Sequence, residues 1–156
     1  MNKLNRKTCF FIGHRDTPES VMPVLADAVE RHIARYGVTE FIVGSRGAFD
    51  RLATRALQCA KQRHPEIRLT LLLAYYIPYK TEALPPGFDE TLYPDGMERV
   101  PRRAAIVRAN RRAIELCDHL IAYDAGRVGN TGALVRFARR RESRGLLTVE
   151  NLYDIS

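Results

Sequence analysis

The stretch TCFFIGHRD at residues 8–16 decides the fold. Its apolar run ends at Gly13, which is typical of a short buried strand followed by a tight turn. The same pattern recurs as TEFIV at residues 39–43 and as DHLIAY at residues 118–123. Two further apolar runs, at residues 68–74 and 146–149, extend the series. The sequence therefore predicts about five strands.

Helical periodicity fills the intervals between these runs. We expect a first helix that Thr17 caps, a second over about residues 49–62, a third over 101–117, and a fourth that Thr131 caps. Alternating strands and helices indicate βαβ units and a parallel sheet. The prediction is a single α/β domain over residues 1–156. It is Rossmann-like and doubly wound, with a core over about residues 8–149, mainly parallel strands and helices on both faces.

Residues 75–100 break this periodicity. They contain four of the seven tyrosines and four prolines. Long gaps of this kind in a compact domain are typically functional, so we expect a long loop or lid with a short helix around Glu90. A surface loop packed by its own aromatic side chains is the alternative.

The charge of the chain is positive and unevenly distributed. The formal net charge is +7, and residues 99–144 contain twelve arginines against four acidic residues. Such a surplus can attract a phosphate-containing ligand or nucleic acid. Solvated helix faces explain the same surplus equally well.

The three cysteines, Cys9, Cys59 and Cys117, form neither a Cys-x-x-Cys motif nor a cluster with histidine. They indicate small buried hydrophobic residues in a reducing compartment, and we expect no bound metal and no cofactor. No apolar segment approaches the roughly 20 residues that span a bilayer. We therefore expect a cytoplasmic protein without a membrane partner.

Polar and glycine-bearing loops follow three of the predicted strands. Parallel strands end at the same edge of a sheet, and this edge is where doubly wound domains bind ligands. Backbone N–H groups at a helix start favour a phosphate there, although each loop alone is also typical of an ordinary turn or helix cap. The candidate ligand-binding residues of these loops are Gly13, His14 and Arg15; Gly44, Ser45, Gly47, Phe49 and Asp50; and Asp124, Gly129, Asn130 and Thr131.

The order of four segments resembles the SLOG superfamily. These segments are FFIGHRD, GSRGAFDRLA, MERVPRRAAIVRAN and CDHLIAYDAGRVGNTGALVRFA. That group of Rossmann-like domains includes the DNA-processing protein DprA and the lonely-guy phosphoribohydrolases, and the likeness is greatest to small bacterial YpsA-like proteins. The resemblance implies a nucleotide-derived ligand whose phosphate is held by the loop at Gly129 and Thr131. It adds Asn110, with its neighbour Arg111, to the expected site, and it implies a homo-oligomer.

Two departures from the family's pattern matter. Asn130 stands where a second glycine often precedes the threonine, and the loop can keep its shape because asparagine tolerates left-handed backbone geometry. The second departure bears on function. The positions where the phosphoribohydrolases carry an arginine and a glutamate correspond here to Ala109 and Leu134. We therefore favour binding or sensing of a nucleotide or nucleotide-sugar ligand, and leave open whether the protein is an enzyme. The first alternative is hydrolysis of a nucleoside monophosphate at its N-glycosidic bond, with Asp50 and Asp124 as candidate catalytic carboxylates.

Nucleic-acid binding through the arginine-rich helices is the second alternative. Binding of single strands commonly uses aromatic side chains on which bases stack. Phe137 is the one aromatic residue within residues 102–112 and 136–144. The sequence therefore favours a small nucleotide-like partner over nucleic acid.

Overall fold

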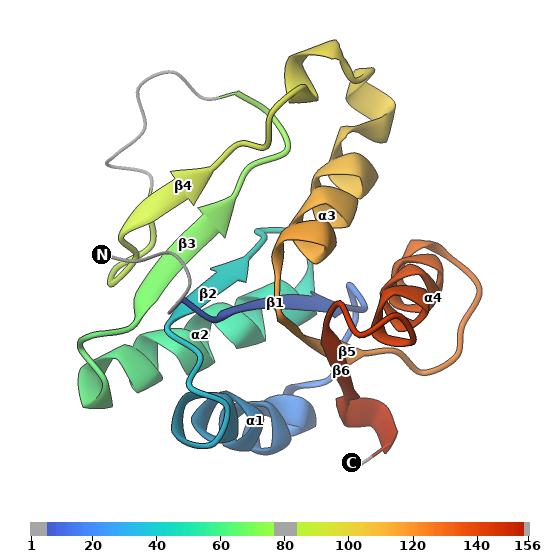
Figure 1. Cartoon of the computed structure of the whole chain (residues 1–156). Helices are drawn as coiled ribbons and strands as arrows, with labels where there is room; N and C mark the ends of the chain where they lie inside the picture. Colours follow the sequence, from blue (N-terminus) through green and yellow to red (C-terminus); the bar gives the residue numbers. More distant parts are fainter. Residues whose placement is uncertain (1–5, 77–83, 155–156) are drawn as a thin grey trace.

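The computed structural model describes residues 6–76 and 84–154, which form a six-stranded parallel sheet (Figure 1). The order across the sheet is β4-β3-β2-β1-β5-β6, and every neighbouring pair is parallel. The strands are β1 (Thr8–Gly13), β2 (Glu40–Val43), β3 (Arg68–Leu72), β4 (Glu90–Leu92), β5 (His119–Tyr123) and β6 (Thr148–Asn151).

Helices cover both faces of the sheet (Figure 1). The helices are α1 (Met22–Ala34), α2 (Ala48–Arg63), α3 (Ala105–Leu116) and α4 (Asn130–Glu142). Helices α1 and α2 pack on one face, and α3 and α4 pack on the other. The chain builds outward from β1 in one direction through β2 and in the other through β5. The strand order therefore reverses between β1 and β5, where doubly wound sheets bind ligands.

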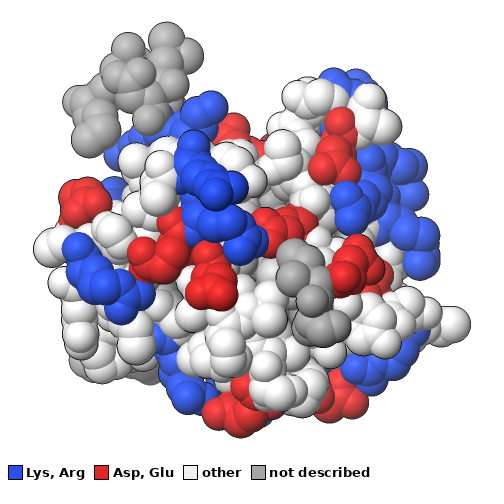
Figure 2. Space-filling model, turned by 90° about the horizontal axis from the view of Figure 1, so that it is seen from below, with Lys and Arg blue, Asp and Glu red and all other residues white. Residues whose placement is uncertain are grey.

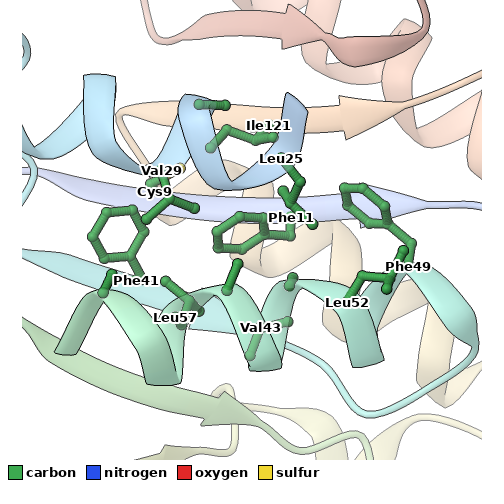
Figure 3. Close-up of a cluster of buried hydrophobic side chains, with 14 of the residues drawn as sticks. Cys9, Phe11, Leu25, Val29, Phe41, Val43, Phe49, Leu52, Leu57 and Ile121 are labelled. Atoms are coloured by element: carbon green, nitrogen blue, oxygen red, sulfur yellow. The ribbon is translucent and has the colours of Figure 1, made fainter. Parts of the chain in front are cut away.

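Strand β1 shows why the central strands are apolar throughout. Cys9 and Phe11 belong to the hydrophobic cluster beneath α1 and α2, where Phe11 packs near Phe41 (Figure 3). Phe10 and Ile12 point to the opposite face and join the cluster beneath α3 and α4. Successive side chains of a strand alternate between faces, so a strand buried on both sides reads as a continuous apolar run. The predicted fold class is thus confirmed.

The predicted number of strands and the predicted helix around Glu90 were wrong. A sixth strand, β4, lies where we expected a short helix, and Glu90 pairs with Thr70 of β3. This strand is three residues long and mostly exposed at the edge of the sheet. Such a short, polar edge strand leaves no apolar pattern in the sequence.

Both threonine caps and one cysteine were also predicted wrongly. Helix α1 begins at Met22, after a 3-10 helix at Glu19–Val21, and the Thr17 hydroxyl instead donates a hydrogen bond to the His14 carbonyl at 2.7 Å. Gly129 is the N-cap of α4, so Thr131 lies within its first turn. Cys9 and Cys117 are buried as expected, whereas Cys59 is exposed on α2.

We predict that Gly13→Ala destabilises the fold through a steric clash. A Cβ atom at Gly13 would lie 2.2 Å from Cγ of the fully buried Phe49. Overpacking of this kind lowers the free energy of unfolding by up to about 3 kcal/mol. The matched variant Gly126→Ala has open space around its Cβ and a φ of +80°, so it should cost only about 1 kcal/mol for a left-handed backbone. Urea unfolding measures the free energy of unfolding of both variants. The prediction is contradicted if Gly13→Ala lowers this free energy no more than Gly126→Ala does.

Candidate functional site

A cleft with a volume of about 160 Å³ opens at the carboxyl ends of β1, β2 and β3. The first turn of α4 and one side of α3 complete its walls. Its lining consists of Ile12, Gly13, Arg15, Gly44, Ser45, Arg46, Asp50, Leu72, Leu73, Ala74, Tyr75, Ile106, Val107, Ala109, Asn110, Asn130, Thr131 and Leu134. The cleft thus joins segments from all parts of the chain at the edge of the sheet that the sequence indicated.

The cleft brings together many, but not all, of the candidate residues. Those that line it are Gly13, Arg15, Gly44, Ser45, Asp50, Asn110, Asn130 and Thr131. Those outside its lining are His14, Gly47, Phe49, Arg111, Asp124 and Gly129. The second group includes buried and loop-supporting residues, whose contacts are described below.

The first turn of α4 presents unused hydrogen-bond donors at the cleft. Gly129 precedes the helix with a φ of +142°, a conformation that favours glycine. Within the described part of the chain, the backbone N–H groups of Asn130, Thr131 and Gly132 have no acceptor. The Thr131 hydroxyl lies 3.4 Å from the carbonyl oxygen of Gly13, to which it can donate. Free amides at a helix start form a site for an anion, with the helix dipole adding to the attraction.

The start of α2 differs because its amides are already occupied. The Ala48 N–H donates to the Arg15 carbonyl at 2.8 Å, and the Phe49 N–H donates to the His14 carbonyl at 3.3 Å. Gly47 permits this contact, since a Cβ there would lie 2.7 Å from Cα of Arg15 and its φ is +92°. The loop at residues 44–50 therefore supports the loop at residues 13–16 through its backbone.

His14 joins the loops on either side of the switch point. Its Nε2 accepts a hydrogen bond from the Ala125 N–H at 2.9 Å, and its side chain is buried. Burial, and then the nearby Arg127 guanidinium, lower the pKa of His14, so the neutral ring that can accept this bond is favoured. Asp16 and Arg127 form a second link, with N–O distances of 2.9 and 3.0 Å. His14 thus positions the loops without lining the cleft.

Three other candidate residues have structural contacts. Phe49 is fully buried beneath Gly13 and stacks with Tyr123 at a centroid distance of 6.4 Å. Asp124 accepts a hydrogen bond from the Gly126 N–H at 3.0 Å, which shapes the turn leading to α4. The Arg111 guanidinium lies over the Phe137 ring, 4.2 Å from its centroid.

Asp50 is the one carboxylate among the described residues that line the cleft. One of its oxygens accepts the Arg46 N–H at 2.9 Å and would lie 2.9 Å from a Cβ at Gly44. Burial raises the pKa of Asp50 to about 6, although the hydrogen bond from Arg46 acts in the opposite direction. A carboxyl group with this pKa can gain or lose a proton near neutral pH, and it can also bond a sugar hydroxyl.

The cleft also contains residues that sequence reasoning did not assign to the site. Arg46 lies within the GSRGAFD segment, and Tyr75 directly follows the third apolar run, but neither type of position marks a ligand by itself. Ile106 and Val107 contribute an apolar wall from α3. Their signal was hidden because an apolar residue on a helix usually indicates packing.

Ala109 and Leu134 both line the cleft. These are the positions where the resemblance places the arginine and glutamate of the phosphoribohydrolases. In this chain the corresponding parts of the cleft wall are therefore apolar.

Comparison with solved structures supports the fold. The chain is similar to the DNA-processing protein A (DprA) from Streptococcus pneumoniae, with a TM-score of 0.63 and 14% sequence identity. The match covers 94% of this chain and 50% of that one, so the chain spans about half the length of the protein it matches. At this identity the match shows a shared fold alone, and the resemblance to the SLOG superfamily and to YpsA-like proteins stays a prediction. Neither a family model nor a curated protein matches the sequence.

Over residues 6–76 and 84–154, no three or more His, Cys, Asp or Glu side chains are grouped to hold a metal ion. Within these same ranges, every helix is too short or too polar to cross a membrane.

We predict that Asp50→Asn stabilises the protein at high pH. The folded state raises the pKa of Asp50 from its ordinary value of 3.8 to about 6, so the ionised carboxylate, which predominates above pH 6, destabilises the folded state. Asparagine does not ionise, and its side-chain oxygen can still accept the Arg46 N–H. The variant should gain up to about 3 kcal/mol at pH 8, and this gain should fall as the pH drops from 6 to 4.

Urea unfolding at pH 8 and pH 4.5 measures this difference. Asp27→Asn, at an exposed carboxylate on α1, is the matched control and should show no such gain. An Asp50→Asn variant that is no more stable than the wild type at pH 8 contradicts the account of Asp50.

Proposed function

We propose that the cleft binds a nucleotide-derived ligand and holds its phosphate at the first turn of α4. The observation that carries this proposal is the set of three consecutive amides, at residues 130–132, without an acceptor in the described chain. The Thr131 side chain lines the cleft beside them. A phosphate group can accept hydrogen bonds from several such donors at once.

The rest of the cleft suits a sugar and a base. Gly13 and Gly44 lie at the ends of β1 and β2 and allow a ligand to approach the backbone closely. Asp50 and Asn110 offer oxygen and nitrogen atoms for hydroxyl groups, while Ile106 and Val107 offer an apolar surface. A concave site with an apolar wall and a few convergent polar groups is typical of small-molecule recognition.

Hydrolysis of a nucleoside monophosphate is a second candidate function, which the position and pKa of Asp50 favour. Against it stand Ala109 and Leu134, two apolar residues of the cleft lining at the positions where the resemblance places the charged side chains of the phosphoribohydrolases. We therefore propose binding without base release.

Chromatographic detection of free base after incubation with each of the four common nucleoside 5′-monophosphates tests this choice. We expect no free base. Base release that Asp50→Asn abolishes, while ligand affinity is retained, would instead assign the hydrolase activity.

Nucleic-acid binding has weaker support. Figure 2 shows one face of the protein on which basic and acidic side chains are interspersed, with a basic group at one edge. Some arginines of α3 and α4 have acidic neighbours, since Arg112 pairs with Glu115 at 3.5 Å and Arg139 pairs with Glu142 at 2.9 Å. These two ion pairs lower the attraction of Arg112 and Arg139 for a phosphate backbone.

We predict that Thr131→Val weakens nucleotide binding. Valine keeps the shape of threonine but removes the hydroxyl, which can turn from the Gly13 carbonyl oxygen to donate to a bound phosphate. Loss of one hydrogen bond to a charged group should raise the dissociation constant about 10- to 100-fold. Isothermal titration calorimetry against the four nucleoside 5′-monophosphates, their diphosphates and ADP-ribose measures the effect.

Thr91→Val, on the exposed edge strand β4, is the matched control and should bind as the wild type does. Two results contradict the proposed function. The first is the absence of wild-type binding across the whole panel. The second is equal affinity of the wild type and Thr131→Val for every ligand that binds.

A further inference from the structure

Two arginines at the cleft, Arg15 and Arg46, have guanidinium groups without a charged partner. Arg15 follows β1, Arg46 follows β2, and both are exposed and line the cleft. Within the part of the chain that the structure describes, neither guanidinium forms an ion pair or a hydrogen bond. By contrast, the neighbouring Arg127 is paired with Asp16 at 2.9 Å. The cleft therefore contains two cations that are available to a ligand.

The backbones of both arginines are held in place. The Arg15 carbonyl accepts the Ala48 N–H at 2.8 Å, and the Arg15 backbone packs directly against Gly47. The Arg46 N–H donates to Asp50 at 2.9 Å. Because the backbones are already fixed, a ligand has to order only the two side chains when it binds.

Tyr75 brings a third cation to the same part of the cleft. Its ring centroid lies 5.4 Å from the guanidinium carbon of Arg46 and 4.4 Å from that of Arg102. Its hydroxyl also lies 3.4 Å from the Arg102 carbonyl oxygen, to which it can donate. The end of the cleft near β2 and β3 is thus positively charged, and Asp50 is the one carboxylate in the described lining.

Arg46 lies away from the first turn of α4, whereas Arg15, like that turn, lies at the end of β1. That turn adjoins β1 at Gly13, whereas Arg46 follows β2, the next strand of the sheet. Adjacent strands lie about 4.8 Å apart, which separates the two positions by roughly 5 to 10 Å along the cleft. A ligand with two linked phosphates can therefore place one at α4 and the other toward Arg46, on the side of the cleft that Arg15 also lines.

We propose that the ligand carries a second phosphate group and that Arg15 and Arg46 bind it. This inference rests on the proposed function and narrows the ligand to nucleoside diphosphates and related nucleotides with two linked phosphates. Arginine suits this role because its planar fork can donate two hydrogen bonds to a single phosphate.

The test compares each of the four nucleoside 5′-monophosphates with its diphosphate by calorimetry, in buffer without divalent metal ions. For the base that binds best, the diphosphate should bind at least about tenfold more tightly than the monophosphate. Arg15→Gln and Arg46→Gln should each reduce this ratio to about threefold or less. Arg51→Gln, at an exposed arginine of α2 outside the cleft lining, is the matched control and should retain the full ratio.

The outcomes separate this inference from the proposed function. If monophosphates bind but diphosphates bind no more tightly, the second phosphate site is overturned while the proposed function stands. The same conclusion follows if both variants weaken monophosphates and diphosphates equally. If no nucleotide of either kind binds the wild type, both proposals fail.

Discussion

Phe49 packs beneath Gly13, and the geometry of the cleft depends on this contact. A side chain as small as a methyl group at Gly13 would collide with the ring. The contact sets the first turn of α2 directly against the end of β1. From there, the Ala48 and Phe49 amides bond the backbone of the loop at residues 13–16. Because Arg15 belongs to that loop, its position in the cleft follows from a buried hydrophobic contact.

The two helix starts beside β1 consequently have different roles. The amides at the start of α2 are used within the protein, whereas those at the start of α4 have no acceptor in the described chain. His14 and the Asp16–Arg127 pair connect the loop before α4 to the loop after β1. The start of α4 is therefore held in place by the loop that precedes it, and its amides are still available to an anion.

The sequence predicted the architecture well because the central strands are apolar on both faces. The alternation of apolar runs and helical periods was enough to place β1, β2, β3 and β5, and it placed β6 two residues too early. It failed at β4, whose three mostly exposed residues depend on pairing with β3. Threonine was also a poor guide to helix starts, since Thr17 bonds back to His14 and Gly129 precedes α4 in its place.

The candidate site was predicted in outline, because glycines at strand ends mark loops that gather at one edge of the sheet. The roles of individual residues depend on direction, which one sequence does not reveal. His14 looked like a ligand donor, but it is buried and bonds Ala125. Tyr75 and Ile106 contribute to the cleft from segments whose patterns indicated a loop and ordinary helix packing.

The most direct measurement is an NMR titration of the 15N-labelled protein with a nucleoside 5′-monophosphate. It compares two helix starts in the same molecule. Our account predicts that the amide signals of Asn130, Thr131 and Gly132 shift strongly on binding, while those of Ala48 and Phe49 shift little, because their donors are already bonded to the Arg15 and His14 carbonyls. Large shifts at Ala48 and Phe49 with none at residues 130–132 would contradict the placement of the phosphate at α4.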